Sequence, residues 1–546
     1  SIDTEADYAD SGGVNSVAVS GNLLAVAVES KNKQNTGVVA FYGLNESTGV
    51  ASHLANVAVG ALPDNVVFTP DGTKLLVACE GEPNQDYSND PEGSVAVIEV
   101  LNGTPANKAT IISFSDFNTG GSRHDELPTG VRIYGGAFNG VASTVAQDLE
   151  PEYISVSKDS STAFVSLQEN NALAVIDLNG TITDDSLLRI LDLGTKDYSK
   201  AGNELDVSDR DEDAPVNGTL LNNGKARINI QTQDNVIGMY QPDTIASYHA
   251  NGAQYVVTAN EGDAREYISG TINEDYDNQA TCEAESLNWD ASVDACFEGD
   301  TPTSCATKGL LNKENEECFS YLEEFRLEEL SSAEAYGDFV APIPDAVSAL
   351  ADNFSADITA RINDEELGRL KLSIVNSINS DTGLVETVNS YGARSFTIWN
   401  DQGQVVFDSG SDMARVTAGR VGEFFNASND RAPDNKKNDR SSAKGPEPEA
   451  LTIGEVNGRT YAFVGLERVG GIMVYDITDP YGVQFIEYTV NRDFTKDPTD
   501  GTEGAEAGDV GPEGMAFVAA SDSPTGKALL VVGNEVSGTT SVYEVK

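Results

Sequence analysis

Residues 75–82 read Leu-Leu-Val-Ala-Cys-Glu-Gly-Glu, an apolar run of strand length that ends abruptly at a carboxylate. The same pattern recurs at residues 23–29, 163–169, 255–261, 461–467 and 529–535. Short runs rich in Val, Ile, Thr and Tyr, separated by Asp-Gly, Asn-Gly and Pro-Asp, are typical of β-strands. Six strand-like runs that each end in a glutamate indicate a repeat protein.

Each repeat fits the four strands, a to d, of one propeller blade. The predicted strands are 15–19, 23–28, 37–42 and 53–59; 65–69, 74–79, 94–100 and 109–114; 153–156, 163–167, 172–177 and 188–193; 244–248, 255–259, 394–399 and 405–408; 450–453, 461–465, 472–476 and 484–488; and 515–518, 528–532 and 540–545. The last repeat lacks strand d, and residues 2–9 are available to complete it. We therefore predict an all-β protein, a β-propeller of six or seven blades with six repeats counted, that forms a single domain over residues 1–546.

The fourth repeat is interrupted by residues 262–392, which we predict to be an inserted, partly helical subdomain with helices near 320–336, 344–354 and 363–372. Because neighbouring strands alternate in direction, this and the other long connections fall on one face, where function is expected. The insertion contains Cys282, Cys296, Cys305 and Cys318, which match no CxxC zinc pattern and predict two disulfides of undetermined pairing. Cys79 is predicted to be a buried thiol.

The charge is extreme, with 88 acidic against 34 basic residues and a net charge of −54. This excludes nucleic acid as a partner, because phosphate binding needs clustered Lys and Arg. Such a surface repels itself unless cations neutralise it, although a solubility charge suited to a saline medium explains the same balance. No apolar run is long enough to span a membrane. The chain starts at Ser1 without a signal peptide, and we expect a processed, secreted protein.

Two series of carboxylates are predicted to surround the mouth of the central channel. One ends strand b of each repeat (Glu29, Glu80, Glu169, Glu261, Glu467 and Glu535), and the other precedes strand a (Asp64, Glu152, Asp243, Glu449 and Glu513). Backbone N–H groups, or Arg265, Arg394 and Arg468, are alternative partners for some of them. The others are predicted to bind several Ca²⁺ ions, because hard cations prefer oxygen ligands and the chain has three histidines. Asp206, Asp209, Asp211 and Asp213 form a second candidate calcium loop.

Catalytic motifs are absent from the sequence: there is no GxSxG elbow, no P-loop and no HExxH. We therefore predict no catalytic residue and favour a structural protein over an enzyme. A carboxylate metal centre beside arginines could nevertheless bind phosphate and hydrolyse esters.

Several long motifs are similar to the choice-of-anchor I family, among them LLVACEGEPNQDYSNDPEGSVAVIEV, VTANEGDAREY, KGPEPEALTIGEVNGRTYAFVGLERVGGIMVYDI and VVGNEVSGTTSVYEV. The resemblance covers nearly the whole chain, apart from roughly residues 273–318. It implies an exported bacterial β-propeller of a family often labelled alkaline phosphatase-like. A subset that the chain resembles more closely comprises surface-layer (S-layer) proteins of marine gammaproteobacteria.

From these observations we expect a calcium-binding structural subunit that self-assembles into a two-dimensional lattice on the cell surface, outside the outer membrane. Outer-membrane lipopolysaccharide is a candidate partner. One alternative is a secreted, metal-dependent phosphoesterase with its site at the channel mouth. A second alternative is a carbohydrate- or lipopolysaccharide-binding module.

Overall fold

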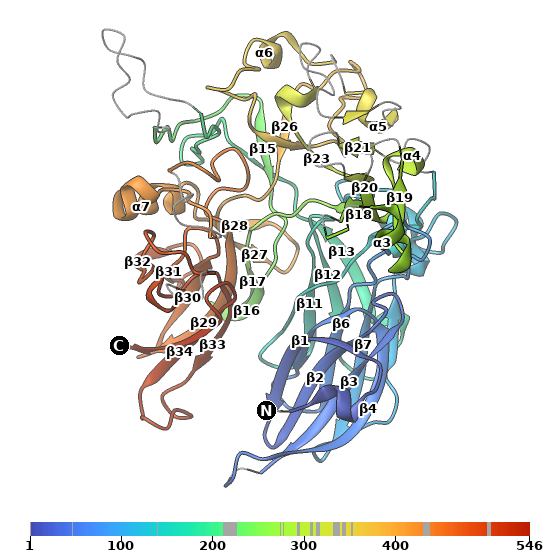
Figure 1. The fold of residues 1–546 in the computed structure, drawn as a ribbon. Coiled ribbons are helices and arrows are strands. Elements are labelled where there is room, and N and C mark those ends of the chain that lie inside the picture. Colours follow the sequence, from blue (N-terminus) through green and yellow to red (C-terminus); the bar gives the residue numbers. More distant parts are fainter. Residues whose placement is uncertain are drawn as a thin grey trace.

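Six antiparallel sheets follow one another along the chain, one for each predicted repeat (Figure 1). The computed structural model describes residues 2–45, 47–138, 140–210, 227–273, 275–276, 278–291, 295–305, 310–312, 317–330, 339–340, 345–350, 353–429, 437–499 and 504–546. Within these ranges, no helix has the length and apolar character needed to cross a membrane.

The first three blades contain β1 (Ser11–Ser20), β2 (Leu23–Ser30), β3 (Thr36–Leu44) and β4 (Ala51–Ala61); β5 (Pro63–Phe68), β6 (Lys74–Cys79), β7 (Ser94–Leu101), β8 (Thr104–Pro105) and β9 (Thr110–Ser113); and β10 (Ile154–Val156), β11 (Thr162–Leu167), β12 (Ala172–Asp177) and β13 (Leu187–Asp192). The other three contain β16 (Ile245–Ala250), β17 (Ala253–Ala259), β27 (Phe396–Asn400) and β28 (Val405–Asp408); β29 (Pro448–Val456), β30 (Arg459–Leu466), β31 (Ile472–Asp476) and β32 (Gln484–Thr489); and β33 (Pro512–Val518), β34 (Ala528–Asn534) and β35 (Thr539–Val545). Every predicted strand is present in the predicted order, and the β-propeller prediction is confirmed.

Tight hairpins connect strands a and b because glycines adopt the left-handed conformation that these turns need. Gly21 and Gly458 have φ angles of 56° and 76°. The first strands of successive blades, β1, β5, β10, β16, β29 and β33, lie next to one another around a central axis. Apolar side chains from the facing sheets form a core between each successive pair of blades.

The ring is open between its last and first blades, which Figure 1 shows set apart. The described residues form no apolar core between these two blades, and Val17 of β1 and Val542 of β35 are 61% and 60% exposed. Residues 2–9, which were available to complete the last blade, do not pair with it. Instead, helix α1 (Thr4–Asp7) lies on the first blade, where the Tyr42 hydroxyl donates to Asp7 at 3.1 Å. Within the described ranges, the sixth blade therefore has three strands and a free edge at β35.

The inserted subdomain lies on one side of the ring, away from both chain termini (Figure 1). Its main sheet contains β18 (Glu266–Ile272), β19 (Asn288–Asp290), β20 (Ala295–Gly299), β21 (Leu310–Asn312), β22 (Cys318–Leu322) and β24 (Phe339–Val340). A smaller sheet pairs β23 (Glu324–Arg326) with β25 (Lys371–Ser373). In another, β15 (Val236–Met239) lies between β14 (Thr195–Asp197), which like β15 precedes the insertion, and β26 (Val388–Ser390). Two disulfides, Cys282–Cys296 and Cys305–Cys318, confirm the predicted number, and Cys79 is a buried free thiol as predicted.

The helices predicted in the insertion are mostly wrong. Residues 320–322 and 324–326 belong to strands β22 and β23, and a 3-10 helix (Leu327–Leu330) follows. Residues 331–338 lie outside the described ranges. Among the described residues of 344–354, the helix α5 is limited to Asp345–Ser348, and 363–372 contains turns and the start of β25. Cross-strand pairing, such as Phe325 with Leu372, overrides the local preference for helix. The other α-helices of the described residues are α2 (Val145–Asp148), α3 (Gln279–Ala284), α4 (Pro302–Cys305), α6 (Ala356–Thr359) and α7 (Asp412–Val421).

Candidate metal centre at the channel mouth

Three of the Pro–acid pairs lie at irregularities in the pairing register between strands a and b. Pro63 pairs with Cys79 and Pro448 with Leu466, and in both blades the register shifts immediately afterwards. Pro512 pairs with Asn534 in the same way. Proline has no N–H to donate to the ladder, and a bulge redirects the side chain that follows it. This local geometry brings the strand-a acids to the same end of the blades as the strand-b glutamates.

The structure gathers some of these carboxylates into three groups. In each group, oxygens from three side chains lie within 4.8 Å of one another; the groups are Glu80, Glu152 and Glu169; Asp243, Glu261 and Glu449; and Glu261, Glu447 and Glu467. Each group joins acids from two adjacent blades. The predicted ring is therefore a set of inter-blade clusters.

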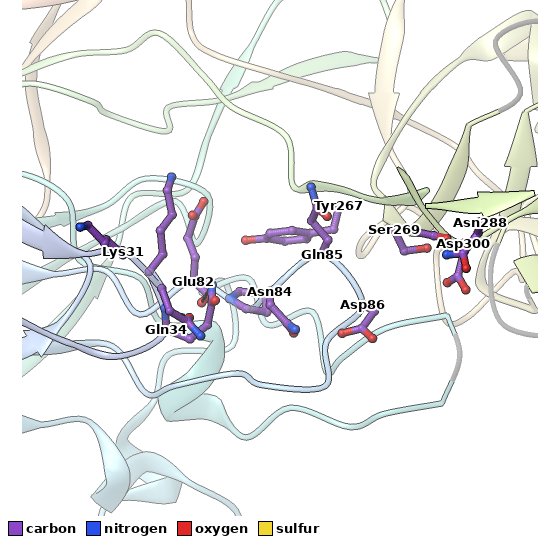
Figure 2. A pocket seen from close by; sticks show the side chains of 14 residues that line it. Lys31, Gln34, Glu82, Asn84, Gln85, Asp86, Tyr267, Ser269, Asn288 and Asp300 are labelled. Atoms are coloured by element: carbon purple, nitrogen blue, oxygen red, sulfur yellow. Dashed lines mark hydrogen bonds between the residues drawn. The ribbon is translucent and has the colours of Figure 1, made fainter. Parts of the chain in front are cut away.

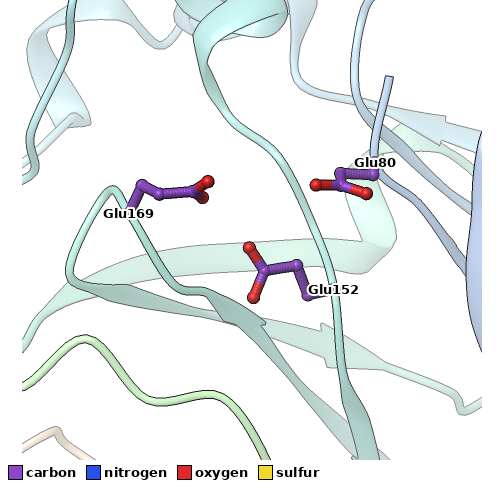
Figure 3. Close-up of side chains that lie close together, drawn as sticks. All are labelled: Glu80, Glu152 and Glu169. Atoms are coloured by element: carbon purple, nitrogen blue, oxygen red, sulfur yellow. The ribbon is translucent and has the colours of Figure 1, made fainter. Parts of the chain in front are cut away.

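The first group, which we call the uncompensated cluster, consists of Glu80, Glu152 and Glu169, whose carboxylates point toward one another (Figure 3). Glu169 is 8% exposed. The Oε2 atoms of Glu152 and Glu169 are buried without a hydrogen-bond partner. Among the described residues, no Lys or Arg forms an ion pair with any of the three. Buried charges that are neither paired nor hydrogen-bonded are costly, so this arrangement needs a proton or a cation.

The pKa shifts in the uncompensated cluster also indicate that it needs a proton or a cation. Burial raises the pKa of Glu80 well above its ordinary value, and the neighbouring carboxylates, first among them Glu82, raise it further. Burial followed by repulsion from Glu169 and Glu80 raises the pKa of Glu152 in the same way. A divalent cation would remove this repulsion by direct coordination. Three carboxylates with carbonyl or water oxygens completing the shell match the ligands that Ca²⁺ prefers.

A second group, the compensated cluster, consists of Glu261, Glu447 and Glu467. Arg440 and Arg468 place their Nε atoms 2.9 and 3.1 Å from the carboxylate oxygens of Glu447. Lys444 Nζ lies 2.8 Å from Glu261 and 3.4 Å from Glu447. These three cations supply the positive charge that the uncompensated cluster lacks.

In the compensated cluster, the pKa values of Glu447 and Glu467 are shifted in opposite directions. Burial acts to raise the pKa of Glu447, but Arg440, Lys444 and Arg468 together outweigh burial and lower it to about 2. Burial and repulsion from Glu447 and Glu261 raise the pKa of Glu467 to about 8. Three cations therefore face the three carboxyl groups of this cluster, which leaves little charge for an added metal ion to neutralise.

The remaining group, Asp243, Glu261 and Glu449, is intermediate. Glu261 accepts from Gln168 Nε2 at 3.0 Å and pairs with Lys444, whereas Glu449 Oε2 is buried without a partner. Burial, then repulsion from Glu261, raises the pKa of both Asp243 and Glu449. Of these three carboxylates, only Glu261 pairs with a cation among the described residues.

The other predicted ring members do not join a group. Asp64 and Glu513 line an axial cavity of about 530 Å³ together with Asp243. Burial and repulsion from Glu513 and Glu82 raise the pKa of Asp64 to about 7. Glu29 lies 3.5 Å from the side-chain amide of Asn15, and Glu535 is exposed.

The predicted calcium loop is not assembled by the residues that the structure describes. Asp206 is buried and accepts from the backbone N–H of Asn229 at 2.7 Å, and both carboxylate oxygens of Asp209 accept from Arg369. The two side chains therefore face protein donors instead of a common ion. Asp211 and Asp213 lie outside the described ranges.

Of the three arginines predicted to pair with the ring, only Arg468 does so. Arg265 is buried between Asp148 and Glu150, neither of which is a ring member. Arg394 donates to backbone carbonyls, including those of Asp206 and Ser441. Glu447 and Lys444 were not predicted. The run Pro446-Glu447-Pro448-Glu449 duplicates the Pro–acid pair, and this duplication was the signal for Glu447.

Comparison with known proteins gives the family. Gigasin-3a of Magallana gigas is 30% identical over 189 residues, which are 34% of this chain and 66% of that protein. A mesenchyme-specific cell surface glycoprotein of Strongylocentrotus purpuratus is 24% identical over 347 residues, 61% of this chain and 35% of that protein. The chain thus spans just under two thirds of the first relative and about a third of the second.

Among solved structures, a putative 6-phosphogluconolactonase from Bacteroides uniformis aligns with 97% of this chain and 81% of its own, at 10% identity and a TM-score of 0.35. The propeller assignment rests on the sheet topology described above. The model of the choice-of-anchor I domain matches residues 2–316 and 344–480. The chain belongs to the choice-of-anchor I domain family.

Proposed function

We propose that the chain is an exported, calcium-binding β-propeller that self-assembles into a protein lattice on the cell surface, as an S-layer subunit outside the outer membrane. The observation that carries the proposal is the uncompensated cluster, where three carboxylates meet without a basic partner among the described residues. Two disulfides fit an oxidising compartment, and one relative is by name a cell surface glycoprotein.

Self-association is supported by the open ring. Val17 and Val19 of β1 are 61% and 57% exposed, and β35 is the free edge of a three-stranded sheet. Exposed apolar strands and free edges are surfaces on which other chains pair. The net charge of −54 opposes contact between copies, so cations are expected to be required for assembly. Lipopolysaccharide is the proposed partner on the membrane side, because calcium can bridge carboxylates and phosphates.

Electron microscopy of the purified full-length chain tests this function. We expect two-dimensional sheets in millimolar calcium that dissolve when a chelator is added. Val17→Asp should prevent sheet formation, whereas Leu101→Asp, at another exposed apolar position, should not. Chain that remains monomeric in calcium and forms no sheets would contradict the proposal.

The geometry favours calcium binding over phosphoester hydrolysis. The arginines that a phosphate site would need are engaged within the protein: Arg265 by Asp148 and Glu150, and Arg468 by Glu447. We therefore expect no turnover of an aryl phosphate with calcium, iron or zinc supplied. Turnover that disappears in Glu152→Gln would instead favour the phosphoesterase alternative.

A further inference from the structure

A cavity of about 840 Å³ lies between the propeller and the inserted subdomain (Figure 2). The loops that follow β2 and β6 form one wall, and strands β18 to β20 form the other. This volume lies within the range of small-molecule sites, and such sites are common where two structural units meet. The cavity is separate from the uncompensated cluster, none of whose residues line it.

The two walls of this cavity are held in fixed positions. The Ser320 hydroxyl lies within hydrogen-bond distance of the backbone carbonyls of Gln85, in the β6 loop, and Tyr267, in β18. Asp300 donates its N–H to the Ser269 carbonyl at 2.7 Å. The two disulfides cross-link the subdomain next to these strands. The cavity is therefore largely preformed, which lowers the entropic cost of binding.

The polar lining includes five side-chain amides, and the protein orients at least two of them. Gln34 Nε2 donates to the Glu82 carbonyl at 3.3 Å, and Asn288 Nδ2 donates to the Gly299 carbonyl at 2.6 Å. An amide has two N–H donors and two oxygen lone pairs, so these contacts leave donor and acceptor capacity on the same group. Paired donors and acceptors of this kind match a ligand with adjacent hydroxyl groups.

One aromatic ring stands among these amides. Tyr267 is half-buried, and its ring lies 5.1 Å from that of Tyr87 at an interplanar angle of 86°. This edge-to-face contact fixes the orientation of the Tyr267 ring. Figure 2 shows the ring between the loop residues Gln34 and Glu82 and the subdomain residues Ser269 and Asp300. A rigid aromatic ring offers a stacking surface for the C–H face of a sugar ring.

Other ligand classes fit this lining less well. Among the described residues, Pro83 and Tyr267 are the only apolar side chains in the lining, which disfavours a lipid. Three carboxylates outnumber Lys31 and Lys33, and Lys31 pairs with Glu5 at 2.7 Å, which disfavours an anion. The lining carboxylates are also not among the described groups whose oxygens converge.

We propose that this cavity is a binding site for a saccharide, in which Tyr267 stacks on a sugar ring and the amides of Gln34 and Asn288 bind its hydroxyl groups. The site would give the chain a glycan-binding activity that does not depend on the uncompensated cluster. The sugar can be free or part of a lipid-linked glycan, since the recognised chemistry is the same.

Saturation-transfer NMR and calorimetry with the disulfide-bonded full-length chain test this site. The probes are cellotriose, maltotriose, chitotriose and mannotriose, with lipopolysaccharide micelles and sugar-free phospholipid micelles as a lipid-linked arm. We expect at least one glycan probe to bind with a Kd of about 1 mM or tighter. Tyr267→Ala should weaken this binding at least about tenfold, and Tyr267→Phe should retain it because the ring remains.

Gln34→Ala and Asn288→Ala remove polar contacts at the cavity surface and serve where Tyr267→Ala does not fold. Each should weaken binding about five- to tenfold. Glu152→Gln should bind the glycan as the unmodified chain does, which separates this proposal from calcium binding. Absence of binding by every glycan probe, or binding that Gln34→Ala and Asn288→Ala leave unchanged, would overturn the proposal.

Discussion

Two carboxylate clusters lie at the same end of the propeller, and they differ in how their charge is balanced. Glu261, Glu447 and Glu467 face Arg440, Lys444 and Arg468. Glu80, Glu152 and Glu169 face no cation among the described residues and leave two buried oxygens without partners. The same repeat therefore forms an ion-paired cluster between the fourth and fifth blades and, in our proposal, a calcium ligand set between the second and third.

The largest expected effect on the free energy of unfolding comes from removing the shared carboxylate of the compensated cluster. Glu447→Gln removes the carboxylate shared by three cations, and we expect the free energy of unfolding to fall by about 3–5 kcal/mol, because the cations remain partly buried without their partner. Urea unfolding monitored by circular dichroism measures this loss. Glu455→Gln, at an exposed position of β29, is the control and should be nearly neutral. If Glu447→Gln were as stable as the control, the ion pairs of the compensated cluster would not stabilise the fold as proposed.

The same cluster should make stability sensitive to acid. The pKa of Glu447 is depressed to about 2, so its stabilising effect is complete above the ordinary value near 4.5 and is lost as the pH falls through the folded value. Between pH 4.5 and pH 2, protonation of Glu447 should lower the free energy of unfolding by about 3 kcal/mol. Unfolding titrations of the unmodified chain and Glu447→Gln at several pH values should differ in slope across this window. Equal slopes would refute the assignment.

The uncompensated cluster should make stability depend on calcium. At calcium concentrations 100-fold above Kd, we expect a stabilisation of about 2.7 kcal/mol, and hence a lower Tm after chelation. Glu152→Gln should abolish this difference and, in chelator, match or exceed the stability of the unmodified chain because repulsion is relieved. Differential scanning calorimetry with and without calcium measures both effects. A Glu152→Gln chain that still responds fully to calcium would place the ion elsewhere.

The smallest expected effect comes from converting one cluster toward the other. Glu80→Lys places a cation beside Glu152 and Glu169, as Lys444 lies beside Glu261. We expect chelation then to change the free energy of unfolding by less than about 1 kcal/mol, since an internal ion pair replaces the metal. Thermal unfolding in calcium and in chelator provides the measurement, with Glu455→Gln as the calcium-responsive control. A chelation effect as large as in the unmodified chain would show that charge balance is not the cause.

The blades could be predicted from the sequence because each strand has a local signal, an apolar run bounded by a turn and a carboxylate. The ring acids followed from the same repeat, and Glu80, Glu152 and Glu169 do converge. Their different environments could not be predicted, because Arg440 and Lys444 come from a connection between blades with no repeating pattern. The insertion is partly helical as predicted, but the positions of its helices were mostly wrong since cross-strand partners such as Phe325 and Leu372 are far apart in sequence.

The closure of the ring was also beyond local patterns. Residues 2–9 were available to supply a fourth strand for the last blade, but Asn56 and Tyr42 of the first blade hold Asp7 instead. Such a choice between two distant docking surfaces depends on tertiary contacts. The sequence shows that the last repeat lacks strand d, but it does not show that residues 2–9 leave this position unfilled.

The most direct test is an anomalous difference map from crystals of the full-length chain grown in calcium. We predict a peak between the carboxylates of Glu80, Glu152 and Glu169, and no peak among Glu261, Glu447 and Glu467, whose charge Arg440, Lys444 and Arg468 already balance. An empty uncompensated cluster, or an ion bound at the compensated cluster in its place, would contradict the assignment of the metal centre.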